Sequence, residues 1–156
     1  MHSKTPIVAA AAALALSGAS TAETVMVTIT GEVEQNQIGP APLGLAGPGD
    51  RATISFTIDS DVFVDNASFP TRGYPIDPGS FEASYGAASL GLQDPFPGGQ
   101  TPYFVLRDND PAVDGFFLST DIDGPIGVPI SQNGIFGQFR ASFHVTYGGA
   151  TLPSLD

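Results

Sequence analysis

The clearest pattern along the chain is an alternation of apolar and polar residues that follows the turn signal Gly49-Asp50. The apolar members are Ala52, Ile54, Phe56 and Ile58, and the polar members between them are Thr53, Ser55 and Thr57. A period of two is typical of a β-strand with one buried face and one solvated face. The segment therefore predicts a half-buried strand that ends at the acidic stretch Asp59-Ser60-Asp61.

Other strands are expected at residues 24–34, 80–85, 88–92, 115–120 and 138–147. Residues 103–106 are apolar on both faces, which predicts a central strand. Segments 59–78 and 125–134 contain several prolines and are expected to be irregular. Short strands separated by Gly/Pro turns predict an all-β fold, an antiparallel β-sandwich of about seven or eight strands resembling a jelly roll. An open barrel fits nearly as well.

The first 22 residues have the features of a secretion signal. Ile7 to Leu16 is an unbroken apolar run that is too short to span a bilayer as a helix, and Ser20 and Ala22 suit signal peptidase. We expect cleavage before Glu23, with an uncleaved anchor or a buried helix as the alternative. The predicted organisation is a signal peptide (1–22), a sandwich domain (23–150) and a C-terminal tail (151–156).

The charge of the chain restricts the classes of partner that it can bind. Lys4 would leave with the signal, so that four arginines face sixteen carboxylates and the net charge is 4 − 16 = −12. Nucleic acid and anionic lipid surfaces are disfavoured, because both require a basic patch. Calcium or a neutral polysaccharide fits this charge, and the plain alternative is that the charge keeps a secreted protein soluble. The absence of cysteine excludes disulfides and thiolate sites and favours a bacterial source.

Three sequence features together resemble a known family. They are the N-terminal signal, the strand from Gly49-Asp50 through Ser55-Phe56-Thr57 to Asp59, and the strand from Ser80-Phe81 to Tyr85-Gly86. The chain resembles the ectodomain of bacterial PEP-CTERM exported proteins over about residues 24–147. The resemblance implies life at the cell surface or in the extracellular matrix, near exopolysaccharide, and implies no reaction. The sorting tail that defines the family does not follow Asp156, so we expect either a truncated chain or a relative that is released.

Two acidic loops share one spacing. Asp108, Asp110 and Asp114 stand at i, i+2 and i+6, and residues 59, 61 and 65 repeat that spacing. Calcium takes six to eight oxygen ligands, and alternating carboxylates in a loop can converge on one ion. The sequence therefore predicts Asp108, Asp110 and Asp114 as a calcium site. The alternative is that these residues only stabilise turns.

Catalytic patterns are weak. His144 is the one histidine after the signal, and no nucleophile elbow accompanies its strand neighbour Ser142. Many carboxylates are present, but the sequence pairs none of them across a cleft as a glycosidase requires. We therefore expect a non-enzymatic exported protein at the cell surface or in the extracellular matrix. The alternatives are a calcium-dependent carbohydrate-binding module and, third, a small secreted hydrolase.

Overall fold

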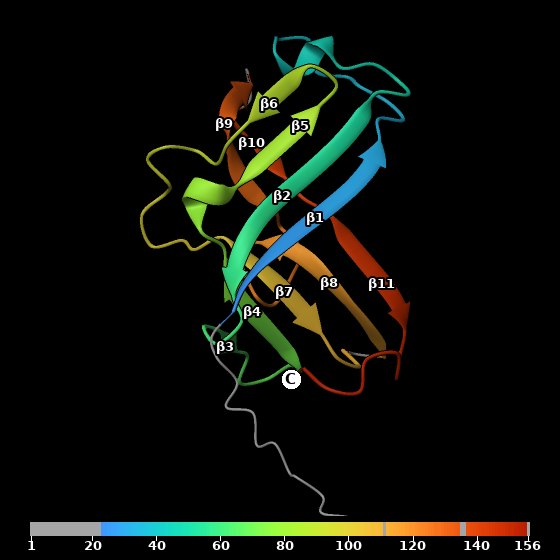
Figure 1. Ribbon diagram of the computed structural model, residues 1–156, viewed down its shortest axis with the longest axis vertical. Coiled ribbons are helices and arrows are strands. Elements are labelled where there is room, and N and C mark those ends of the chain that lie inside the picture. The colour runs from blue at the N-terminus through green and yellow to red at the C-terminus, as the bar shows by residue number, and fades with distance from the viewer. Residues whose placement is uncertain (1–22, 111, 135–136, 156) are drawn as a thin grey trace, which may run out of the picture.

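The computed structural model describes residues 23–110, 112–134 and 137–155, which form eleven β-strands and two short 3-10 helices (Figure 1). All pairings between these strands are antiparallel. The predicted all-β antiparallel fold is confirmed, with more strands than the seven or eight expected. The predicted signal peptide, residues 1–22, lies outside the described residues.

The strands form three sheets. The first has the order β1 (Thr24–Glu32), β2 (Arg51–Asp59), β5 (Glu82–Tyr85) and β6 (Ala88–Leu90). The second has the order β11 (His144–Gly148), β8 (Val113–Ser119), β7 (Tyr103–Arg107), β4 (Thr71–Pro75) and β3 (Val64–Asp65). A two-stranded ribbon pairs β9 (Val128–Gly134) with β10 (Gly137–Ala141), and the 3-10 helices are η1 (Leu43–Leu45) and η2 (Pro78–Ser80).

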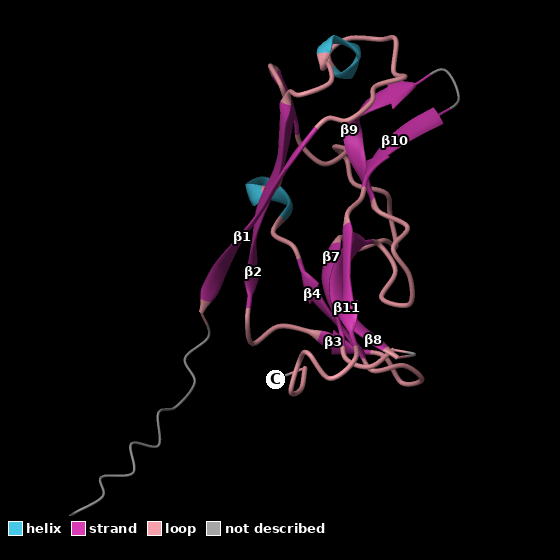
Figure 2. Ribbon diagram, turned by 90° about the vertical axis from the view of Figure 1, so that its right-hand side faces the viewer, coloured by secondary structure: helices cyan, strands magenta, loops and turns pink. Residues whose placement is uncertain are grey.

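The sheets are arranged in two layers around an apolar core. Figure 2 shows β1 and β2 on one side, with the ribbon and the second sheet on the other. Phe56 of β2 is fully buried, and its ring lies 6.3 Å from that of Phe81 and 5.8 Å from that of Phe104. Leu118 and Val128 are also fully buried. The core is therefore made from both layers, as a sandwich requires.

Strand β7 is buried on both faces, as its uninterrupted apolar sequence predicts. Phe104 faces the core, whereas Val105 points to the other side of the sheet and is nevertheless fully buried. On that outer side, Ile122 lies so close to Gly73 of β4 that a side chain at position 73 would collide with it. Ile122, in the loop between β8 and β9, therefore covers part of the outer face of the second sheet.

Three segments differ from the predictions. Residues 71–75 and 128–134 form strands β4 and β9, although their prolines predicted irregular structure. The single long strand expected over residues 138–147 is divided at Ser142–Phe143. Its first half pairs with β9 and its second half pairs with β8, because the chain passes there from the ribbon to the second sheet.

Candidate functional site

The predicted calcium residues do not converge in this structure. Asp108 accepts a hydrogen bond from Asn109 Nδ2 at 2.7 Å, and the backbone N–H of Asp110 donates to Val113 O at 3.0 Å. Asp114 lies within β8 and is fully buried. Across the described residues, no three acidic, histidine or cysteine side chains gather closely enough to hold a metal ion. Calcium binding by these aspartates stays a prediction.

Asp114 instead holds two loop segments through backbone N–H groups. Its carboxylate accepts from Leu152 N at 2.6 Å, from Asn109 N at 2.7 Å and from Thr151 N. These bonds hold the pKa of Asp114 below its usual value, and the bond from Leu152 has the largest effect. Burial acts in the opposite direction and raises the pKa. Asn109 adds a bond from Ala150 N to its Oδ1 at 2.9 Å. The acidic loop thus anchors the C-terminal segment.

The other polar candidates are also placed in structural roles. Asp65 of the first acidic loop forms an ion pair with Arg72 at 2.6 Å, and this contact lowers the pKa of Asp65. Asp59 accepts from Asp61 N at 2.9 Å, which is a turn contact. His144 is exposed on β11, and the Ser142 hydroxyl is directed to Pro125 O at 3.5 Å. Ser142 and His144 therefore form no catalytic pair.

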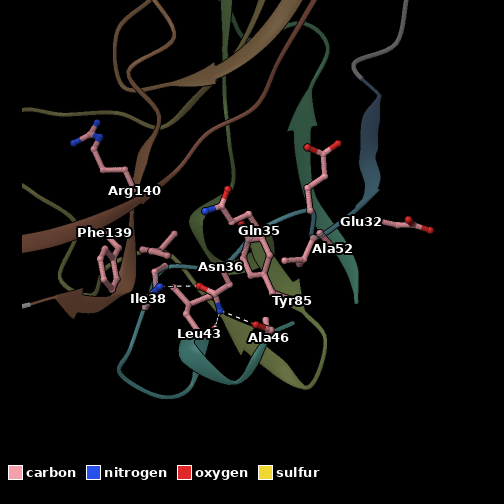
Figure 3. Close-up of a pocket in the computed structure, with 13 residues that line it drawn as sticks. Glu32, Gln35, Asn36, Ile38, Leu43, Ala46, Ala52, Tyr85, Phe139 and Arg140 are labelled. Carbon is pink, nitrogen blue, oxygen red and sulfur yellow. Dashed lines mark hydrogen bonds between the residues drawn. The ribbon is translucent and has the colours of Figure 1, made fainter. Parts of the chain in front are cut away.

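A cleft lies between the first sheet and the ribbon, with a volume of about 590 Å³. One wall is the segment after β1 with the neighbouring residues of β2 and β5, and the other wall comes from β9 and β10. Figure 3 shows Tyr85 and Phe139 on opposite sides, with Ile38 and Asn36 between them. The lining residues are Glu32, Val33, Glu34, Gln35, Asn36, Ile38, Leu43, Ala46, Ala52, Tyr85, Ile130, Phe139 and Arg140.

Two amide side chains fix the loop that forms the floor of the cleft. Asn36 Nδ2 donates to Leu43 O and to Ala46 O, both at 2.7 Å, and Asn36 Oδ1 accepts from Ile38 N at 2.8 Å. Gln132 of β9 accepts from Leu43 N at 3.3 Å and donates to Pro40 O at 3.2 Å. These bonds pair backbone groups of Ile38, Pro40, Leu43 and Ala46 within the protein, so the loop is held in place without a ligand.

The cleft has an apolar floor and a polar rim. Ile130 and Leu43 are buried beneath it, and burial raises the pKa of the Tyr85 hydroxyl, which therefore remains a neutral hydrogen-bonding group. Glu32 and Glu34 form no ion pair within the part of the chain that the structure describes, and the Glu32 side chain points away from Tyr85 and Asn36 in Figure 3. The rim thus offers the carboxylate of Glu34 as an acceptor, with the amide of Gln35 beside it.

The one cation at the cleft is directed elsewhere. Arg140 donates from Nε to Ile126 O at 2.9 Å and from one terminal nitrogen to Thr120 Oγ1 and Gly127 O, each at 2.6 Å. Its side chain points away from Tyr85 and Asn36 in Figure 3. The guanidinium therefore fixes the loop before β9 and does not offer the cleft a site for an anion.

Comparison with known proteins found no matching family model, no matching curated protein and no matching solved structure. No helix among the described residues has the length and apolar character needed to cross a bilayer.

Proposed function

We propose that this chain is an exported, non-enzymatic protein of the cell surface or extracellular matrix, and that it acts by binding neutral exopolysaccharide. The observation that carries the proposal is the preformed cleft, in which the rings of Tyr85 and Phe139 stand over an apolar floor. Ligand sites are commonly preformed clefts of this size, mostly apolar with a few polar groups. The N-terminal sequence and the resemblance described above support export.

The chemistry of the cleft suits a neutral sugar chain. A sugar ring has apolar C–H faces, which pack on aromatic rings such as Tyr85 and Phe139. Its hydroxyls need acceptors and donors, and Glu34 and Gln35 at the rim supply both kinds of group. Binding of an acidic polymer is disfavoured, because residues 23–156 have a net charge of −12 and repel it. Arg140, the cation among the lining residues, is bonded to other groups and cannot offset this repulsion.

The same geometry argues against hydrolysis in this cleft. A glycosidase needs two carboxylates that flank the scissile bond from different sides. Glu32 and Glu34 are two residues apart on one segment, so both approach from the same wall. The described lining contains no histidine, serine or threonine that could act as a nucleophile or base.

Affinity electrophoresis through gels that contain a neutral β-glucan, a galactomannan or acidic alginate tests the proposal. We expect retardation of the wild type by a neutral polymer and none by alginate. Replacing Tyr85 or Phe139 by Leu keeps the apolar volume and removes a ring, which should weaken binding roughly two- to tenfold for each ring. Tyr147→Leu, an exposed ring on β11, is the matched control and should bind as the wild type does.

Two results would contradict this proposal. In the first, no neutral polymer retards the protein. In the second, the Tyr147 variant loses binding as strongly as the Tyr85 variant, which would show general stacking on exposed rings. Retardation that disappears with a calcium chelator would instead favour the calcium-dependent carbohydrate-binding module.

A further inference from the structure

Strand β1 is a long sheet edge with one partner. It pairs with β2 over nine consecutive residues, and no other described strand is bonded to its opposite side. Figure 1 shows β1 at the end of the row of strands β6, β5, β2 and β1. The other end of the same sheet is β6, which has only three residues and leads into a bridge between Leu92 and Ile130 of β9.

The pairing register identifies the backbone groups that β1 presents outward. Val33 N donates to Asp50 O at 2.8 Å at one end, and Glu23 O accepts from Ser60 N at 3.1 Å at the other. Both are odd-numbered residues, and the register between them is unbroken. Hydrogen bonding alternates along an antiparallel strand. The even-numbered residues therefore direct their N–H and C=O groups away from β2; they are Thr24, Met26, Thr28, Thr30 and Glu32.

This edge lacks the features that usually prevent strand association. Natural sheets protect an edge with proline, lysine, a bulge or a very short strand. β1 contains no proline, lysine or arginine, it has no irregularity in its register, and its single charge is Glu32 at the end. Val25 is 37% exposed and Met26 is 66% exposed. A long, regular, nearly uncharged edge of this kind is a site for strand addition.

We propose that β1 pairs with β1 of a second copy of this chain, antiparallel and centred on Thr28. In this register Thr28 faces Thr28 of the other copy, Met26 faces Thr30, and Val27 faces Ile29. All the outward-directed residues then fall into hydrogen-bonded pairs, and each face of the sheet continues into the same face of its partner.

The charges of the edge favour a second copy as the occupant. In the register centred on Thr28, Glu32 faces Thr24, so no two carboxylates stand opposite each other despite the acidity of the chain. The twofold axis is normal to the sheet, so the product is one continuous eight-stranded sheet with a closed, symmetric interface. The inner sides of both four-stranded halves face the same way. The pairing does not depend on what the cleft binds.

Analytical ultracentrifugation of the exported protein, from low micromolar to submillimolar concentration, tests the proposal. We expect a monomer–dimer equilibrium for the wild type. Thr28→Lys places two lysines face to face at the centre of the interface and should abolish the dimer. Ser89→Lys is the matched control, because Ser89 is exposed on the same face at the opposite edge of this sheet, and it should dimerise as the wild type does.

Amide hydrogen exchange of the wild type gives an independent test that requires no variant. Amides of Met26, Thr28 and Thr30 should become protected as concentration rises, whereas those of Val27 and Ile29 should be protected throughout. A wild type that remains monomeric at every concentration would overturn the proposal. So would a dimer that Thr28→Lys leaves intact, or protection that rises equally at odd and even positions.

Discussion

Replacement of Phe56 by Ala tests the core most sharply. Phe56 is fully buried and contacts the rings of Phe81 and Phe104, so its truncation leaves a cavity between the layers and removes two aromatic pairs. Truncation of a buried Phe lowers the free energy of unfolding by about 3–5 kcal/mol. Because Phe56→Ala also removes two ring contacts, we expect a loss in the upper part of this range, about 4–5 kcal/mol. Phe143 is only partly buried and contacts Phe116 at 6.0 Å, so Phe143→Ala should cost about 2–3 kcal/mol.

Urea unfolding at neutral pH, followed by circular dichroism, measures both costs. Phe56→Ala should lower the free energy of unfolding by about 4–5 kcal/mol, and a separate thermal scan should show a fall in melting temperature of roughly 10–20 °C for a domain of this size. Thr57→Ala, on the opposite face of β2, is the control and should stay within about 0.5 kcal/mol of the wild type. If Phe56→Ala does not fold, Phe56→Leu should still cost about 1–2 kcal/mol. Equal losses at Phe56 and Thr57 would refute the two-layer core.

Four further predictions follow from the polar contacts. The N–H groups bonded to Asp114 lower the pKa of its carboxyl, so the ionised carboxylate stabilises the fold at pH values above the usual pKa of 3.8. This contribution is lost as the pH falls below 3.8. The urea midpoint should therefore fall less with decreasing pH in Asp114→Asn than in the wild type. The same variant should release the C-terminal segment from Thr151 onward to carboxypeptidase at neutral pH, and unchanged digestion would contradict the anchoring role. If Asp108, Asp110 and Asp114 bind calcium, millimolar calcium should raise the melting temperature more than magnesium does; equal rises would show that Asp114 keeps its backbone donors and that the three aspartates form no calcium site. Asn36→Ala should leave two loop carbonyls unbonded, cost about 1–3 kcal/mol and weaken polysaccharide binding; a variant that binds normally would show that the loop is not fixed by Asn36.

The sequence predicts the strands whose burial alternates. In β2, Ile54, Phe56 and Ile58 are buried and their neighbours are more exposed, so the pattern and the structure carry the same information. β6 follows the same rule, with Ala88 and Leu90 buried and Ser89 exposed. One-sided burial is what a period of two detects, and this is why these strands could be found without the structure.

Strands that are covered on both sides could not be found in this way. In β9, Val128, Pro129 and Ile130 are all buried in succession, and β4 carries Pro75 at its last position. Neither segment alternates, and proline is usually evidence against a strand. The division of the strand predicted over residues 138–147 also could not be found from the sequence. The apolar and polar residues continue to alternate through Ser142 and Phe143, although the pairing partner changes there from β9 to β8.

The candidate sites also could not be predicted from local sequence patterns. The spacing of Asp108, Asp110 and Asp114 gives no information about side-chain direction, and Asp114 points inward to backbone donors from a segment almost forty residues away. The cleft depends on Gln132 meeting a loop that is about ninety residues distant in the sequence. Contacts of such separation leave no local pattern, so the cleft appears only when the chain is folded.

The most direct test of the account is the location and intact mass of the protein in a culture of the producing cells. Proteins from the cytoplasmic, surface and extracellular-polysaccharide fractions would be recovered and weighed. We expect a chain that begins at Glu23 and is found with the surface and polysaccharide fractions, from which a soluble neutral polysaccharide releases it. A chain that retains residues 1–22 and stays in the cytoplasm would contradict both export and the proposed binding function.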